Sequence, residues 1–335
     1  MEYITTLAAH TPVVLTIGNF DGIHKGHQRL LHELRTMARA LNCVPAIVTF
    51  QPHTLMVVRP DLFVRYLTTT EEKLALARTY GGVADSIVIS FTPQVAAMTA
   101  EAFLDTLRAR FDLKGLVVGA NFSLGHNRKG DVAFLEHYGR QHQIQIHTVS
   151  LEEAEHSRIS STRIRALVSE GSITEANELL GHPLLFSGMV IHGDRRGRLL
   201  GFPTANIRPD EHRLLPADGV YAARILVPGI PGQLDTPASS GRPAEDAAPP
   251  RDSSLHSTVY NGVVNIGVRP TFNGRERVVE AHVLDVDLDL YEQLITIELI
   301  ARLRGEQRFS GIDALKAQIT ADVQQARQIL SMSGG

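Results

Sequence analysis

Apolar residues follow two alternating spacings along the first half of the chain. Short apolar runs predict buried strands at residues 13–17, 44–50, 86–91, 116–119 and 144–149. Apolar positions that recur every three to four residues predict helices at residues 30–41, 69–80, 101–110 and 132–142. Thr69 is the expected N-cap of the second helix, with Glu72 three residues on. Strands alternating with helices predict a mostly parallel sheet with helices on both faces, here an α/β domain over residues 1–184.

The pattern changes near Pro183, after which strands dominate. They are predicted at residues 187–192, 219–227, 258–266, 278–286 and 294–303, followed by a helix at 313–330. Most of the connections are too short for parallel crossovers, which need a dozen or more residues. Residues 185–335 are therefore predicted to form an antiparallel barrel or sandwich that a C-terminal helix closes.

One connection in this second domain is unusual in composition. Residues 229–257 are rich in proline, glycine, serine and acidic residues and hold no aromatic side chain. Such a segment buries too little apolar surface to fold. We interpret it as a disordered insertion in a hairpin; a linker between two separate domains is the alternative.

Composition agrees with a two-domain globular protein. The 335 residues exceed what one core usually serves, and the net charge of -3 gives no positive field for nucleic acid or anionic membranes. The single cysteine, Cys43, excludes an internal disulfide. No apolar run reaches the roughly 18 residues of a membrane span, and the N-terminus lacks the basic stretch of a secretory signal. We expect a cytoplasmic protein, monomeric or weakly homo-oligomeric, without nucleic-acid or membrane partners.

A glycine-rich turn, residues 18–31 (GNFDGIHKGHQRLL), joins the first strand to the first helix. Unpaired N–H groups and the helix dipole at such a turn favour a bound anion. His24 and His27 lie three residues apart, so both imidazoles are expected to face a phosphate. Exposed or capping histidines are the alternative for these residues alone. Asp21 is expected to cap the helix through its carboxylate.

H-K-G-H after G-N-F-D-G resembles the H-x-G-H signature of the nucleotidyltransferase superfamily, enzymes that attack the α-phosphate of ATP and release pyrophosphate. Residues 158–165, R-I-S-S-T-R-I-R, match its second phosphate-binding motif, although their serines also suit a simple helix cap. Together with residues 49–54, 65–73 and 119–131, these motifs resemble the adenylyltransferase module of bacterial bifunctional riboflavin kinase/FAD synthetases. The resemblance implies a Rossmann-like sheet.

The same resemblance implies which residues serve the adenylyltransferase. Catalysis is expected of His24 and His27. ATP binding is expected of Gly18, Phe20, His24, His27, Asn121, Ser161, Thr162 and Arg165. Phe122 is expected to line the flavin side, with a position in the core as the alternative.

Residues 193–206 end in G-F-P-T-A-N and resemble the defining motif of riboflavin kinases. The resemblance implies that Thr204 and Asn206 ligate a Mg²⁺ ion that bridges the ATP phosphates, since a hard cation prefers oxygen ligands. It also implies that Glu280 takes the proton from the 5′-hydroxyl of riboflavin, whereas a lone glutamate on a strand is usually solvated. Arg304 is expected to contact the flavin or a phosphate. The residues expected to bind ATP and magnesium are Gly193, Gly201, Pro203, Thr204 and Asn206.

The two resemblances predict a bifunctional enzyme of flavin cofactor synthesis. The C-terminal riboflavin-kinase barrel is expected to convert riboflavin and ATP to FMN, and the N-terminal domain to convert FMN and ATP to FAD and pyrophosphate. Thr54, Asn121 and Glu292 stand where the family commonly has proline, aspartate and glycine. An adenylyltransferase for another phosphate ester and a flavin-binding regulator without turnover are the alternatives.

Overall fold

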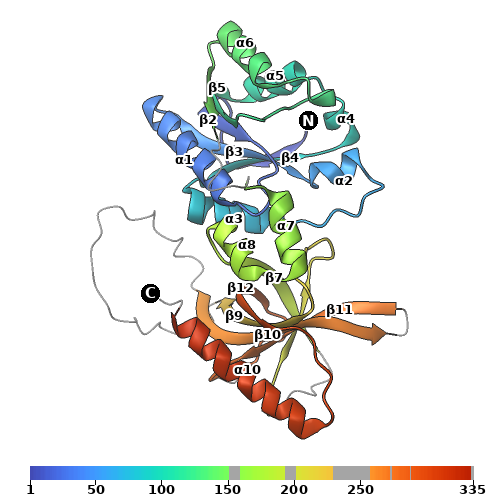
Figure 1. The fold of residues 1–335 in the computed structure, drawn as a ribbon. Helices are drawn as coiled ribbons and strands as arrows, with labels where there is room; N and C mark the ends of the chain where they lie inside the picture. Colours follow the sequence, from blue (N-terminus) through green and yellow to red (C-terminus); the bar gives the residue numbers. More distant parts are fainter. Residues whose placement is uncertain (151–158, 193–200, 229–256, 272–273, 287, 333–335) are drawn as a thin grey trace, which may run out of the picture. The chain divides into compact units, whose positions relative to one another are not determined.

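The chain forms two compact units, Met1–Ser161 and Thr162–Gly335. The computed structural model describes residues 1–150, 159–192, 201–228, 257–271, 274–286 and 288–332 (Figure 1). Helix α7 (Ser161–Glu170) begins at the boundary between the units, and α8 (Ile173–Leu180) lies in the second unit. The division of function at residue 184 stays a prediction.

The first unit is built on a six-stranded sheet in the order β1-β4-β3-β2-β5-β6. Its strands are β1 (Tyr3–Thr5), β2 (Pro12–Ile17), β3 (Val44–Gln51), β4 (Asp85–Ser90), β5 (Asp112–Gly119) and β6 (Gln145–Val149). Strands β2 to β6 pair in parallel, and β1 is antiparallel to β4. The predicted α/β fold with a mostly parallel sheet is confirmed. Strand β1 was not predicted, because three residues are too few to show a period.

Helices pack on both faces of this sheet. They are α1 (Lys25–Ala40), α2 (Thr54–Val58), α3 (Thr70–Gly81), α4 (Pro93–Ala96), α5 (Ala100–Arg110), the 3-10 turn η1 (His126–Arg128) and α6 (Val132–His142). Val13 of β2 lies in a core cluster with Phe103 of α5. Its neighbour Val14 points to the other face, where a Cβ added at Gly115 would lie 3.2 Å from Val14 and 2.6 Å from Met37 of α1.

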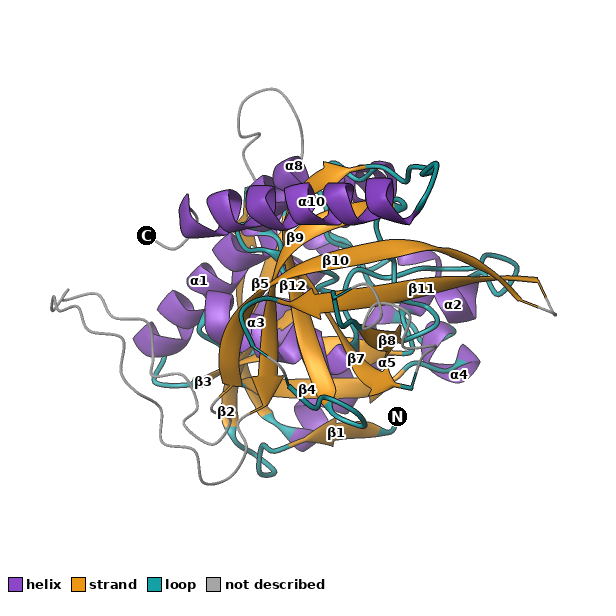
Figure 2. Cartoon of the chain, turned by 90° about the horizontal axis from the view of Figure 1, so that it is seen from below, coloured by secondary structure: helices purple, strands orange, loops and turns teal. Residues whose placement is uncertain are grey.

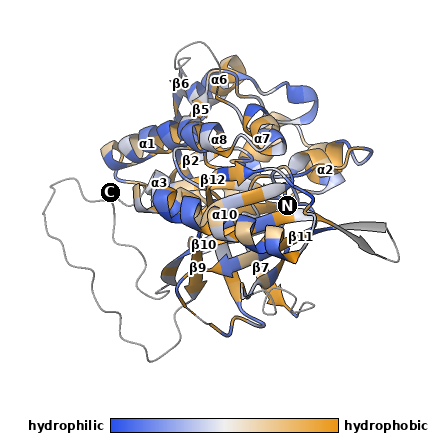
Figure 3. Cartoon of the chain, turned by 60° about the horizontal axis from the view of Figure 1, so that its bottom comes forward, coloured by the Kyte–Doolittle hydropathy of each residue, from blue (hydrophilic) through white to orange (hydrophobic). Residues whose placement is uncertain are grey.

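The second unit is a closed antiparallel barrel in the strand order β10-β11-β8-β7-β12-β9 (Figure 2). Its elements are β7 (Leu184–Ile191), β8 (Ala205–Pro209), β9 (Gly219–Pro228), β10 (Ser257–Thr271), β11 (Gly274–Val283), β12 (Leu294–Arg304) and the helix α10 (Ile312–Met332). Apolar and polar residues succeed one another along α10 (Figure 3). Its buried Ala326 and Leu330 join a core cluster with Val220 and Ala222 of β9. The predicted barrel with a C-terminal helix is confirmed.

The two strands that flank the proline-rich segment are neighbours in the barrel. Pro228 at the end of β9 pairs directly with Ser257 at the start of β10. Residues 229–256 therefore connect adjacent antiparallel strands of one barrel. Residues 229–256 lie outside the described residues, so the predicted disorder of residues 229–257 stays a prediction.

Candidate active sites

The turn after β2 leaves the sheet where ligands bind to α/β folds. β2 lies between β3 and β5, and the loops that follow β2 and β5 leave the sheet at the same edge, at the point where the strand order reverses. The turn is sharply bent, with φ angles of 48° at Phe20, 85° at Gly22 and 38° at Ile23. Such φ values are rare outside glycine, and they cluster at functional sites.

His24 is the N-cap of α1. Its Nδ1 accepts a hydrogen bond from the backbone N–H of His27 at 3.3 Å. Because Nδ1 is the acceptor, a neutral His24 carries its proton on Nε2 and has its donor there. The two imidazole rings stack with centroids 3.6 Å apart and an angle of 15° between their planes. The structure thus brings the two predicted histidines together at a helix N-terminus.

Two further predicted residues shape the same turn. Gly18 donates its N–H to the carbonyl of Val48 at 3.0 Å, and a Cβ at this position would lie 3.3 Å from the ring of Phe20. Phe20 is buried and packs edge-on against His27, with ring centroids 5.2 Å apart. Because glycine has no side chain, the ring of Phe20 can lie close to position 18 while it packs against His27.

The prediction that Asp21 caps α1 is wrong. Asp21 is 2% exposed, and its carboxylate accepts hydrogen bonds from the N–H groups of Leu67 at 2.9 Å and Thr68 at 3.0 Å. The hydroxyl of Thr68 also donates to Asp21 at 3.2 Å and accepts from the N–H of Gly22 at 3.0 Å. Asp21 thus fixes the turn to the segment before α3.

The remaining residues predicted for the adenylyltransferase lie in different places. The hydroxyl of Ser161 donates to the carbonyl of Asp21 at 2.9 Å, which brings the start of α7 to the turn. Thr162 and Arg165 follow on α7, in the second unit. Asn121 is exposed just after β5, and nothing in the structure explains its departure from the family pattern. Phe122 is half-buried against the core of the first unit.

A buried lysine beside the turn was not predicted as functional. Lys73, in the first turn of α3, is 4% exposed, and its Nζ donates to Oγ1 of Thr49 at 3.2 Å. The hydroxyl of Thr49 in turn donates to the carbonyl of Asn19 at 3.3 Å. Burial lowers the pKa of Lys73 to about 8, against the opposing effects of Asp21 and Glu71. The capping-box spacing predicted the helix that carries Lys73, but it did not predict the contacts of the Lys73 side chain.

Lys73 gives the first unit a pH-dependent stability. Its pKa is about 8 in the folded protein and 10.5 in the unfolded chain, so the unfolded chain binds more protons between these values and stability rises with pH. Burial of the charged ammonium group costs up to about 3 kcal/mol of folding free energy, and full deprotonation of Lys73 removes this cost. The free energy of unfolding is measured by urea denaturation, followed by circular dichroism, at pH 7.5 and 9.5. Between these pH values, the difference in unfolding free energy between the wild type and Lys73→Met should change by about 2 kcal/mol in favour of the wild type. A difference that is the same at both pH values would contradict this.

The predicted kinase motif borders a cavity in the second unit. Gly193 lies outside the described residues, whereas Gly201 adopts a φ of 87°. A cavity of about 550 Å³ is lined, among others, by Val190, Pro203, Thr204, Ala281, Leu290 and Tyr291. The ring of Tyr291 also stacks on that of His192, with centroids 4.1 Å apart. Pro203 and Thr204 therefore lie where a small molecule can enter.

Glu280 and Asn206 meet on adjacent strands. Glu280 of β11 pairs directly with Asn206 of β8 on one side and with Asn265 of β10 on the other. Residues opposite each other in antiparallel strands point to the same side of the sheet, so these half-buried polar side chains form one row. Asn265 was not predicted; an amide inside the apolar run V-V-N-I-G was the available signal.

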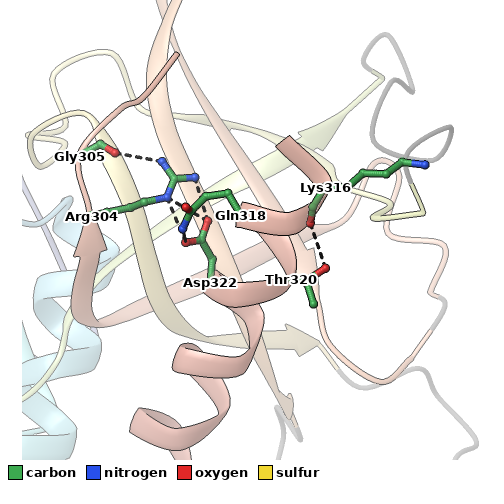
Figure 4. A network of polar contacts seen from close by, with 6 residues as sticks. All are labelled: Arg304, Gly305, Lys316, Gln318, Thr320 and Asp322. Atoms are coloured by element: carbon green, nitrogen blue, oxygen red, sulfur yellow. Dashed lines mark hydrogen bonds and ion pairs between the residues drawn. The ribbon is translucent and has the colours of Figure 1, made fainter. Parts of the chain in front are cut away.

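Arg304 is held by the C-terminal helix (Figure 4). Its Nε donates to Oδ1 of Asp322 at 3.0 Å, its Nη2 to Oδ2 at 2.8 Å, and its Nη1 to the carbonyl of Gly305 at 3.0 Å. Gln318 donates to the same carboxylate at 2.9 Å. The ring of Phe309 lies 5.7 Å from the guanidinium carbon. These contacts fix the end of β12 to α10, and the flavin or phosphate contact of Arg304 stays a prediction.

Breaking this ion pair is expected to loosen α10. Asp322 is 3% exposed, so Asp322→Ala leaves a largely buried guanidinium without its counter-charge and should destabilise the unit by about 3 kcal/mol. Hydrogen exchange measured by mass spectrometry should show faster exchange in peptides from α10. Gln325→Ala, at an exposed position of the same helix, should leave exchange unchanged. Equal protection in both variants would show that the pair adds no stability.

Comparison with known proteins shows the family to which this chain belongs. A family model described as FAD synthetase matches residues 6–163, and one described as riboflavin kinase matches residues 180–330. The bifunctional riboflavin kinase/FMN adenylyltransferase of Escherichia coli K12 is 36% identical over 321 residues, or 96% of this chain and 93% of that protein. The chain belongs to this family. It is a transferase with riboflavin kinase and FMN adenylyltransferase activities, and ATP is a co-substrate.

Other family members and a solved structure resemble the chain over similar lengths. The bifunctional enzyme of Pseudomonas fluorescens is 34% identical and covers 97% of this chain and 95% of its own length. That of Listeria monocytogenes is 32% identical, with 94% and 91% covered. A crystal structure from Streptococcus pneumoniae described as a macrolide-efflux protein superposes with a TM-score of 0.79 at 29% identity, covering 96% of each chain.

In the described part of this chain, every helix is too short or too polar to cross a membrane.

Two departures from the family pattern have visible structural counterparts. Thr54, where the family commonly has proline, accepts a hydrogen bond from the side-chain amide of Asn19 at 2.9 Å, which proline cannot do. Glu292, where the family commonly has glycine, adopts a φ of 61°, the left-handed conformation that glycine adopts readily. Its N–H donates to the carbonyl of Val190 at 3.0 Å. The turn after Tyr291 therefore keeps a backbone conformation suited to glycine.

Proposed function

We propose that the two activities use separate sets of residues, one at the turn of the first unit and one in the barrel. The observation that carries the first assignment is the stacked pair His24 and His27 at the N-terminus of α1. N–H groups at this helix end favour the phosphates of ATP. The donor nitrogen of His24 points to a role in stabilising charge on the α-phosphate while an FMN phosphate oxygen attacks and pyrophosphate leaves.

Further residues of the adenylyltransferase are assigned by the family motifs. Gly18 and Phe20 shape the turn, and the residues proposed to bind the triphosphate are Asn121, Ser161, Thr162 and Arg165. The hydrogen bond from Ser161 to the turn supports its place in this set. Phe122, which is half-buried, is proposed to line the flavin side.

In the barrel, Glu280 is proposed as the general base of the riboflavin kinase. Its carboxylate takes the proton from the 5′-hydroxyl of riboflavin as that oxygen attacks the γ-phosphate of ATP, and ADP leaves. The direct pairing with Asn206 supports this role, because it puts the base beside the G-F-P-T-A-N motif. Gly193, Gly201 and Pro203 are proposed to shape the ATP side, and Arg304 to contact the flavin or a phosphate.

The residues at this motif fit Mg²⁺ with few protein ligands. Thr204 and Asn206 offer a hydroxyl and an amide oxygen, and Glu280 lies opposite Asn206. The part of the chain that the structure describes contains no group of three histidine, cysteine or acidic residues that could hold a metal ion. Phosphates and water would therefore supply most of the ligands, as is usual for this ion. When bound, Mg²⁺ supplies positive charge that neutralises the phosphates. We further propose a cytoplasmic enzyme, monomeric or weakly self-associating, without nucleic-acid or membrane partners.

A time course with riboflavin, ATP and Mg²⁺, resolved by chromatography of the flavins, tests the pair of activities. FMN is expected to rise before FAD, because the kinase makes the substrate of the adenylyltransferase. Unchanged riboflavin with conversion of added FMN would contradict the kinase assignment. Conversion of neither flavin, with FMN bound, would favour the flavin-binding regulator.

A further inference from the structure

His282 of β11 holds the part of the G-F-P-T-A-N motif that leads into β8. Its Nδ1 lies 2.7 Å from the carbonyl oxygen of Pro203. Because a carbonyl oxygen only accepts, Nδ1 of His282 carries a proton and is the donor of this bond. The ring of Phe202 meets the imidazole edge-on, with centroids 5.7 Å apart and an angle of 85° between the planes. One half-buried side chain thus contacts two consecutive residues of the motif.

The backbone pairing of the two strands ends where this contact begins. The last pair of β8 and β11 in this direction is Ala205 opposite Ala281. Pro203 has no N–H group and cannot donate to a neighbouring strand. Gly201, two residues earlier, has a φ of 87°, a left-handed conformation that takes the chain out of an extended path. The bond from His282 therefore fixes the backbone at a point where strand pairing no longer does.

The direction of the Thr204 side chain depends on this stretch of backbone. Successive side chains of an extended chain point to opposite sides, so Thr204 shares a side with Asn206 only while the chain stays extended through both. Asn206 is directly opposite Glu280, and His282 lies on the same side of β11 as Glu280, two residues on. A backbone that turned away at Pro203 would therefore take the Thr204 hydroxyl out of this row.

We propose that His282 is a positioning residue for the riboflavin kinase, whose bond to Pro203 keeps the chain extended so that the Thr204 hydroxyl stays on the same side as Asn206 and Glu280. This inference rests on the roles proposed above for these three residues. His282 acts through the backbone of Pro203 and is assigned no contact with a substrate. Its removal therefore changes the order of the motif before it changes any chemical step.

The test measures hydrogen exchange by mass spectrometry in peptides that cover residues 201–206 of the full chain. His282→Phe and His282→Leu remove the donor, whereas His282→Asn keeps an N–H group at the place of Nδ1. The amides of residues 204–206 should exchange about fivefold faster in the two variants without the donor, as the loss of one net hydrogen bond predicts. In His282→Asn they should exchange as in the wild type. His137→Phe, the same change at an exposed histidine of the first unit, should leave the exchange unchanged.

Kinase activity gives a second readout on the same proteins. Groups that orient the ligands of a metal contribute about 10–100-fold to metal affinity or activity. The Mg²⁺ concentration that gives half the maximal rate of FMN formation should therefore rise about tenfold in His282→Phe and His282→Leu, and stay close to the wild-type value in His282→Asn. The rate of FMN adenylylation on the same preparations should be unchanged, and circular dichroism checks that each variant is folded.

The outcomes separate this inference from the proposed function. Unchanged exchange in His282→Phe and His282→Leu overturns the inference, and so does equal acceleration in all three variants, because the donor then has no part in it. If Thr204→Val phosphorylates riboflavin at the wild-type rate, the proposed role of Thr204 fails instead. If Thr204→Val is inactive and the variants without the donor need no more Mg²⁺ than the wild type, only the role of His282 is wrong.

Discussion

The double variant His24→Ala/His27→Ala is expected to lose FAD formation while it still converts riboflavin to FMN. The change removes both imidazoles from the helix N-terminus where the α-phosphate is proposed to react. Loss of one preorganised donor typically lowers a rate by about 10²–10³, so both together should lower FAD formation at least about a thousandfold. Initial rates of both reactions, measured on one preparation, check this expectation.

The control for this variant lies in the same unit. His137→Ala changes an exposed histidine on α6 and should leave both rates unchanged. Removal of the His24 cap should also destabilise α1 by about 1 kcal/mol, so folding is checked by circular dichroism. A folded double variant that has lost both activities would contradict the assignment of two separate sites.

Glu280→Gln is expected to have the opposite selectivity. Glutamine keeps the size of the side chain and its place opposite Asn206, but it cannot take a proton from the riboflavin hydroxyl. Because a positioned general base contributes about 10²–10⁴ to a rate, FMN formation should fall by about a thousandfold. Conversion of added FMN to FAD should continue at the wild-type rate.

An exposed glutamate of the same unit provides the matched control. Glu211→Gln, in the turn after β8, should leave both rates as in the wild type. If Glu280→Gln keeps kinase activity within about tenfold of the wild type, another group accepts the proton, because the loss is then smaller than a general base contributes.

Features that depend on neighbouring residues were predictable from the sequence. The capping box of Thr69 and Glu72 is present, with the Thr69 hydroxyl accepting from the N–H of Glu72 and the Glu72 carboxylate accepting from that of Thr69. The alternation of strands and helices likewise predicted the sheet, since each period reflects one face of a local element. The histidines could be placed at the turn because the strand before them and the helix after them each show such a local period.

Features that depend on distant residues were not predictable. Asp21 was expected to cap the helix that follows it, yet its partners lie 46 and 47 positions along the chain. Lys73 and Asn265 went unnoticed because their significance comes from a partner on another strand or turn. One sequence shows which residues can form hydrogen bonds but not which of them the fold brings together.

The pairing of Pro228 with Ser257 has a consequence for how this chain can evolve. The register of β9 and β10 is set by the paired strands themselves, from Ser257 opposite Pro228 to Ile266 opposite Gly219. In the loop-closure relation, the length of the connection between two paired strands enters the free energy of folding only as a logarithm, with about 0.6 kcal/mol for each doubling. Insertions and deletions between these two strands are therefore nearly neutral for the barrel. The barrel can tolerate a gain or loss of chain between β9 and β10, while β8 and β11, which carry the proposed kinase residues, stay in register.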